Sequence, residues 1–156
     1  MSSNSLNTLI KLCRSGKIYE IKQLLTGSKH IDLNKNNEFG MTPLLAACQA
    51  DSHNIIKILL DRGANPNVID SETGKNCLMF SKKKENLRLL LKSGADPFHR
   101  DYKGNDVLYY HKPSQTYGPE NMKFLENYQI QIIKQIIYEL TEIPPEIGSL
   151  IGEYIL

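Results

Sequence analysis

The sequence has no tryptophan, and it has only three cysteines among its 156 residues. Three cysteines cannot all pair with one another, and their spacing fits no metal site, so neither a disulfide framework nor a structural zinc is expected. No apolar run is long enough to cross a bilayer, and the first residues do not resemble a signal peptide. These absences predict a protein of a reducing compartment, in the cytoplasm or also in the nucleus.

An excess of charge of one sign is also missing. The 19 Lys and Arg residues nearly balance 17 Asp and Glu residues, which leaves a formal net charge of +2. A nucleic-acid-binding protein usually carries a clustered basic face, so we expect no nucleic-acid partner. The run Lys82-Lys83-Lys84 is the exception. We interpret it as a solvated turn near a helix C-terminus, and the alternative is an electrostatic site for an acidic partner.

Motifs for catalysis and for cofactors are absent as well. The histidines lack the i, i+4 spacing of a metal-binding helix, no glycine-rich phosphate loop follows a strand, and no Gly-x-Ser-x-Gly elbow occurs. We therefore expect a non-enzymatic protein with no catalytic residue, cofactor, metal, small-molecule substrate or membrane partner. The scattered histidines are His30, His53, His99 and His111.

What the sequence does contain is a unit of two short helices and a turn at residues 40–67. Thr42 can cap the first helix, and Pro43 suits its first turn because no backbone donor is needed there. Residues 55–60 are rich in Ile and Leu and give the second helix a wide apolar stripe. Gly63 can end that helix in the left-handed conformation, and turn-forming residues follow it.

The same unit recurs with a period of ~33 residues. The recurring positions are the glycines Gly40, Gly74 and Gly104, the pairs Gly63-Ala64 and Gly94-Ala95, and the pairs Leu24-Leu25, Leu59-Leu60 and Leu90-Leu91. Together with Thr-Pro-Leu at residues 42–44, this pattern resembles the ankyrin-repeat family over roughly residues 4–128. The resemblance implies an all-α ankyrin-repeat solenoid of about four helix–turn–helix repeats with β-hairpin-type loops, followed by C-terminal helices.

We expect an ankyrin-repeat domain at residues 1–128 and a C-terminal helical cap at residues 129–156. The expected repeats cover residues 4–36, 37–70, 71–101 and 102–128. The first repeat has polar residues in place of Thr-Pro-Leu, which suits an N-terminal cap. The third is short at its inner turn, and Pro113 stops the first helix of the fourth early. These two repeats are therefore predicted to be the weakest part of the stack.

The resemblance also places a target-binding face, because ankyrin proteins usually bind through hairpin tips and the exposed side of the first helices. The residues at those positions are Asn36, Glu38, Phe39, Met41 and Gln49 in the second repeat, Ile69, Ser71, Glu72, Lys75, Lys82 and Lys83 in the third, and Arg100, Tyr102, Lys103 and Asn105 in the fourth. Phe39, Met41 and Tyr102 are the candidate anchors, since aromatic side chains and methionine are enriched in interfaces. The alternative is that Phe39 and Met41 pack onto neighbouring repeats.

The sequence departs from the repeat after residue 128. Residues 129–140 have the pattern of an amphipathic helix. Its apolar positions are Ile130, Ile133, Ile136, Ile137 and Leu140. The prolines that follow end one helix and begin another, whose apolar residues fall on one face.

The segment at residues 143–156 resembles the opening of an F-box, with the pattern Leu-Pro-x-Glu-Ile/Leu, three residues, Ile, two residues, Tyr-Leu. The F-box-like residues are Ile143, Pro144, Pro145, Glu146, Ile147, Leu150, Ile151, Tyr154 and Ile155. This resemblance implies recruitment of a Skp-type adaptor of a cullin–RING ubiquitin ligase. Ankyrin repeats with such a tail are similar to poxvirus proteins and some intracellular bacterial effectors, which implies a role in the host cytoplasm. The alternative is a simple binding module or an IκB-like blocker of a host protein, whose tail only caps the stack.

Overall fold

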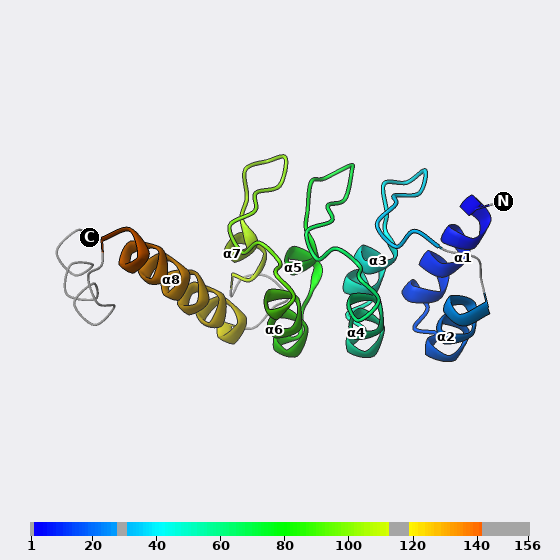
Figure 1. The fold of residues 1–156 in the computed structure, drawn as a ribbon. Coiled ribbons are helices and arrows are strands. Elements are labelled where there is room, and N and C mark those ends of the chain that lie inside the picture. The colour runs from blue at the N-terminus through cyan, green and yellow to red at the C-terminus, as the bar shows by residue number, and fades with distance from the viewer. Residues whose placement is uncertain (1, 28–30, 113–118, 142–156) are drawn as a thin grey trace.

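The structure, a computed structural model, is a row of helix pairs with loops projecting from one edge (Figure 1). It describes residues 2–27, 31–112 and 119–141. The helices are α1 (Ser2–Arg14), α2 (Ile18–Gly27), α3 (Pro43–Gln49), α4 (His53–Leu60), α5 (Cys77–Phe80), α6 (Lys84–Lys92), α7 (Val107–Tyr110) and α8 (Pro119–Thr141). The described ranges contain no strand, and an isolated antiparallel bridge joins Ile69 to Asn76. The predicted all-α repeat solenoid is confirmed.

The inner helices of the second, third and fourth repeats (α3, α5 and α7) all begin at a capping side chain. Thr42 Oγ1 accepts a hydrogen bond from the backbone N–H of Leu45 at 3.2 Å, and Pro43 occupies the first turn of α3 as predicted. Asn76 and Asp106 cap α5 and α7 through the same contact with the residue three positions later. Each cap satisfies a backbone donor that a helix start otherwise leaves without a partner. Threonine, asparagine and aspartate therefore all act as the N-cap at the same position of the repeat.

The core follows the whole row between the inner and outer helices. A buried side chain of Leu or Ile contributes ~1.5–3 kcal/mol relative to an exposed one, so the stack depends on this continuous layer. The completely buried Leu and Ile side chains are Leu9, Ile21, Leu44, Leu45, Ile55, Ile56, Leu59, Leu78, Leu87, Leu90 and Leu125.

Three cysteines lie in this core, one from each of α1, α3 and α5. The side chains of Cys13, Cys48 and Cys77 are all 0% exposed. Burial, with a smaller contribution from the neighbouring Cys48, raises the pKa of Cys13 to about 12. Burial also raises the pKa of Cys77 well above the usual thiol value. These thiols are core packing residues.

Neighbouring repeats are joined by a recurring asparagine. The amide of Asn34 donates to the carbonyl of Gly63 at 3.5 Å, and its Oδ1 accepts from the N–H of Asn65 at 2.7 Å. Asn67 makes the same two contacts one repeat later, with the carbonyl of Gly94 at 2.9 Å and the N–H two residues further on at 2.8 Å. Each of these two asparagines thus fixes the start of its projecting loop against the end of the next outer helix.

The fourth repeat is completed by α8, which has 23 residues against four in α7. The first half of α8 packs on the stack, where Leu125 is completely buried and the amide of Asn121 donates to the carbonyl of Lys82. Gln129 Nε2 donates to the carbonyl of Pro97 at 2.7 Å. The separate helix predicted at residues 129–140 is the second half of this continuous helix. The expected domain boundary after residue 128 lies inside it.

The second half of α8 leads away from the row of repeats (Figure 1). Its isoleucines remain 42–48% exposed among the described residues, at Ile130, Ile133, Ile136 and Ile137. The interpretation that the isoleucine-rich segment covers the last repeat is therefore wrong for these side chains, because residues 119–129 provide that cover. None of the described helices, α8 included, has the length and apolar character needed to span a membrane.

Candidate functional site

Loops project from the row between successive helix pairs (Figure 1). We name them finger A (residues 32–42), finger B (residues 65–76) and finger C (residues 96–106). One side chain closes each tip by accepting hydrogen bonds from backbone N–H groups. Asn37 does so in finger A at 3.0 Å, Asp70 in finger B at 2.7 Å and Asp101 in finger C at 2.8 Å. Such turns hold the loop backbone in one conformation.

Sequence analysis did not identify these closing residues. The signal for them is an Asn or Asp that stands three or four positions before each recurring glycine, at Asn37, Asp70 and Asp101. Asn and Asp accept backbone hydrogen bonds from residues shortly after them, which favours this kind of turn.

Finger C is tied to the inner helix beside it by a buried acid. Asp101 is 6% exposed and accepts a hydrogen bond from the hydroxyl of Tyr110 in α7. Burial opposes ionisation of Asp101, but donors from Tyr110, Asn105 and Lys103 more than compensate and lower the pKa of Asp101 to about 2. Burial and the bond to Asp101 raise the pKa of Tyr110 to about 12. Lys75 Nζ from finger B lies 4.5 Å from the centroid of the Tyr110 ring, so the third and fourth repeats meet here.

Neighbouring fingers pack against each other at glycines. A Cβ on Gly40 would lie 1.7 Å from Ser71 Oγ, and a Cβ on Gly74 would lie 2.6 Å from the ring of Tyr102. The backbone N–H of Ser71 donates to the carbonyl of Gly40 at 3.4 Å, and that of Tyr102 donates to the carbonyl of Thr73 at 3.1 Å. The fingers therefore form one connected surface.

Most of the predicted target-binding residues lie on this surface. The exposed ones are Asn36, Glu38, Phe39, Ser71, Glu72, Lys82, Lys83, Arg100, Tyr102 and Lys103, and the partly buried ones are Gln49, Ile69, Lys75 and Asn105. Phe39 and Tyr102 are 66% and 65% exposed, as anchors need to be. Met41 is only 6% exposed, so its prediction as an exposed anchor is wrong. Its N–H donates to Asn37 Oδ1 at 3.0 Å, and this turn directs the side chain into the core.

The three lysines at residues 82–84 lie in two different environments. Lys82 follows the end of α5, as predicted, but Lys83 and Lys84 open α6, where the helix dipole disfavours a cation. Asp51 compensates by accepting from the backbone N–H groups of Lys82 and Lys83 at 3.0 and 3.2 Å, and its carboxylate lies 3.9 Å from Lys83 Nζ. Lys84 Nζ lies 5.4 Å from the ring centroid of Phe124 in α8. Lys82 and Lys83 are exposed.

The histidines in the described ranges connect repeats. His53 Nδ1 lies 2.8 Å from Asn86 Oδ1, and His99 Nε2 lies 2.7 Å from the carbonyl oxygen of Gly74. His111 Nε2 lies 3.1 Å from the carbonyl of Leu78, and burial lowers the pKa of His111. His53 therefore has a structural role between the second and third repeats. His30 and the F-box-like residues 143–156 lie outside the described residues.

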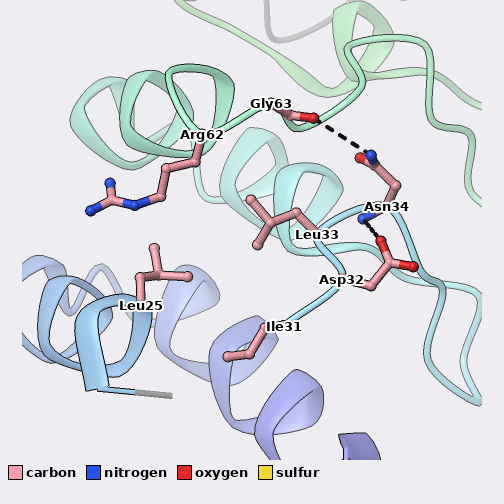
Figure 2. A pocket seen from close by; sticks show the side chains of 7 residues that line it. All are labelled: Leu25, Ile31, Asp32, Leu33, Asn34, Arg62 and Gly63. Atoms are coloured by element: carbon pink, nitrogen blue, oxygen red, sulfur yellow. Dashed lines mark hydrogen bonds between the residues drawn. The ribbon is translucent and has the colours of Figure 1, made fainter. Parts of the chain in front are cut away.

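A shallow pocket lies where finger A leaves the first repeat (Figure 2). Figure 2 shows the amide of Asn34 directed at the carbonyl of Gly63 and the backbone of Asn34 bonded to Asp32. Asn34 joins the two repeats here and Asp32 holds the loop backbone, so these two side chains serve the fold and not a ligand. Within the ranges the structure describes, no three His, Cys, Asp or Glu side chains are placed to hold a metal ion. The pocket is lined by Leu25, Ile31, Asp32, Leu33, Asn34, Arg62 and Gly63.

Known proteins share this organisation. A family model described as ankyrin repeats, in three copies, matches residues 8–101. An ankyrin repeat protein of Acanthamoeba polyphaga mimivirus is 38% identical over 86 residues, which cover 53% of this chain and 11% of the viral protein. The ankyrin repeat protein YahD of Escherichia coli is 32% identical over 95 residues, which cover 56% of this chain and 46% of YahD. The chain therefore spans less than half the length of either relative.

Proposed function

The chain belongs to the ankyrin-repeat family, whose members typically act as non-enzymatic protein-interaction modules, and we propose that it holds a target protein on the surface formed by its fingers. The observation that carries this proposal is the exposure of Phe39 and Tyr102, at 66% and 65%, on fingers whose backbones are closed by side-chain hydrogen bonds. Large aromatic side chains supply much of the energy of interfaces. Holding them in place before binding reduces the entropy that binding costs.

A target can be sought with the full chain as bait in host-cell lysate and quantified by mass spectrometry. We expect Phe39→Ala and the double variant Phe39→Ala/Tyr102→Ala to lose the enriched target. The matched control is Tyr19→Ala, which removes a 70% exposed aromatic side chain on α2, away from the fingers. Equal loss in the control, or full retention in the finger variants, would contradict the proposal.

We propose further that the F-box-like tail recruits a Skp-type adaptor, so that the target is brought to a ubiquitin ligase in the host cytoplasm. The residue pattern at 143–156 supports this, and so does the direction of α8, which leads away from the repeats. Co-purification with purified Skp-type adaptor is expected for the full chain and is expected to be lost in Ile147→Asp and Tyr154→Ala. Unchanged recovery of the adaptor with both variants would rule this role out.

A second candidate is a binding module or inhibitor that blocks its target, with a tail that serves only as a cap. The half-exposed isoleucines of α8 favour it, because an exposed apolar stripe is stabilised by cover. This candidate expects removal of residues 142–156 to lower the melting temperature while target binding is unchanged below the transition. The adaptor role instead expects the truncated chain to keep the target and lose the ligase.

A further inference from the structure

Residues 71–112, from the tip of finger B to just beyond α7, are basic although the whole chain is nearly neutral. Residues 71–112 contain nine Lys and Arg residues and five Asp and Glu residues, whereas the net charge of the chain is only +2. Two of these five acids are already engaged, because Asp101 is buried against Tyr110 and Asp106 caps α7. The acids of this segment therefore balance only part of its positive charge.

Five of these cations lie on the predicted target-binding face, at Lys75, Lys82, Lys83, Arg100 and Lys103. The contacts of Lys75, Lys83 and Arg100 leave the charge of these three side chains largely uncompensated. The one ion pair found within the described ranges, Lys83 with Asp51, is 3.9 Å long, and the Lys83 side chain is 60% exposed. Lys75 lies over the rings of Tyr110 and Phe80, and Arg100 donates to the carbonyl of Gly104 at 2.7 Å. Aromatic rings and a carbonyl oxygen orient these side chains without neutralising them.

The inner helices between these cations carry no charge. α5 has the sequence Cys-Leu-Met-Phe and α7 has Val-Leu-Tyr-Tyr. Tyr109 of α7 is 40% exposed, and Phe80 at the end of α5 is partly buried. A low-dielectric surface bordered by charges of one sign concentrates the electric field above it and attracts the opposite charge.

The opposite end of the same face carries a different charge at the predicted positions. In finger A and α3 the predicted positions are Asn36, Glu38, Phe39 and Gln49, and among them Glu38 alone is charged. At the predicted positions the face therefore changes along the row, from Glu38 in finger A to Arg100 and Lys103 in finger C, which form its basic end. Such a gradient can fix the direction in which an extended partner lies.

From this distribution we infer that the basic end binds an acidic segment of a partner protein, whose carboxylates meet Lys75, Arg100 and Lys103 and whose apolar residues contact Tyr109 and Tyr102. This inference rests on the proposed function and specifies the chemistry of the target. A short acidic protein segment fits better than a nucleic acid, because it can occupy the basic end alone, whereas a longer phosphate backbone would also meet Glu38 at finger A.

The test uses the full chain and a fluorescent peptide of alternating glutamate and leucine, with the glutamine–leucine peptide for comparison. In anisotropy titrations we expect the glutamate peptide to bind and the glutamine peptide to bind at least about tenfold more weakly. Binding should weaken as salt is raised from low to physiological concentration. Arg100→Glu/Lys103→Glu should reduce affinity about tenfold or more. The control Lys22→Glu/Lys57→Glu makes the same charge change at exposed positions on α2 and α4 and should leave binding unchanged.

Equal loss of affinity in both double variants, or equal binding of the two peptides, would overturn the inference. Tighter binding of a single-stranded oligonucleotide than of the glutamate peptide would also overturn it in favour of a nucleic-acid site. Failure here is distinguishable from failure of the proposed function. A target that is lost with Phe39→Ala but kept with Arg100→Glu/Lys103→Glu would retain the binding face and exclude the acidic segment.

Discussion

The ring of Tyr102 lies against the backbone of Gly74, so closely that a Cβ on this glycine would be 2.6 Å from a ring atom. Gly74 has a φ of +73°, a conformation that residues with a side chain rarely adopt. One finger thus supports the exposed aromatic residue of the next. The position of Tyr102, a candidate binding residue, therefore depends on Gly74 of the neighbouring repeat.

Gly74→Ala is expected to destabilise the chain more than Gly104→Ala. The two glycines have similar φ values, +73° and +80°, but a Cβ on Gly104 would meet nothing within 4 Å. Both variants therefore carry the strain of a left-handed alanine, of order 1–2 kcal/mol, and only Gly74→Ala also displaces the ring. Urea unfolding followed by circular dichroism measures the difference. Equal losses of unfolding free energy would show that the ring moves away at no cost.

Stability is expected to depend on Asp101 at acidic pH. The folded-state pKa of about 2 lies below the ordinary value of 3.8, so at intermediate pH the folded state binds fewer protons at Asp101 than the unfolded state does. Its contribution to stability is fully present above pH 3.8 and is lost as pH falls toward 2. Asp101→Asn should flatten the pH dependence of unfolding in this window. An unchanged slope in Asp101→Asn would contradict this assignment.

The partner of Asp101 gives an opposite dependence at alkaline pH. The pKa of Tyr110 is raised from 10 to about 12, so its neutral hydroxyl is favoured in the folded state. The resulting stability is present below pH 10 and is lost as pH rises toward 12. Tyr110→Phe should remove this dependence and also raise the pKa of Asp101, measurable by NMR titration of the carboxyl carbon. Tyr109→Phe is the control, since Tyr109 lies beside Tyr110 and is 40% exposed.

The buried thiols should react in an order that reports local stability. Cys13, Cys48 and Cys77 are inert in the folded chain because each is completely buried. In a repeat stack, stability is nearly a sum over neighbouring repeats, so the weak end opens first. α5 has only four residues against seven in α3. We therefore expect Cys77 to be alkylated before Cys13 at rising urea, as followed by mass spectrometry. Simultaneous labelling would indicate one cooperative unit.

Phe39→Ala and Met41→Ala should separate binding from stability, although the residues are two positions apart. Met41 is 6% exposed, and truncation of a buried methionine costs ~2–5 kcal/mol. Phe39 is 66% exposed, so its truncation should change the unfolding free energy by less than about 0.5 kcal/mol and instead remove target binding. Thermal unfolding and the lysate enrichment together check both. A large loss of stability in Phe39→Ala would mean that the residue is a packing residue.

The repeat itself could be predicted from sequence, because it rests on local chemistry. A threonine cap, a proline in the first turn and recurring glycines specify helix starts and turns within a few residues of one another. The sequence pattern did not predict that Phe39 points outward and Met41 inward, because the hydrogen bonds of Asn37 decide which side chain turns inward.

The predictions also failed where contacts between repeats decide the outcome. The three lysines at 82–84 were predicted to lie together in one solvated turn. In the structure, Asp51 from the preceding repeat pairs with Lys83, while Lys84 lies over the ring of Phe124. A domain boundary was expected after residue 128, because the isoleucine pattern begins there. Packing of Leu125 and Gln129 on the stack produces one helix across that point.

The length of α8 beyond Gln129 sets the distance and the direction at which residue 141 lies from the repeats. From Gln129, which bonds to Pro97, the helix continues for 12 residues to Thr141, which corresponds to ~18 Å at 1.5 Å per residue. Whatever follows residue 141 therefore starts from the end of a rigid arm. Insertion of one residue into this arm would turn its end by about 100° and move it ~1.5 Å, while insertion of a full heptad would extend it with little rotation. In the proposed adaptor, such insertions would change the geometry between a bound target and the tail in steps.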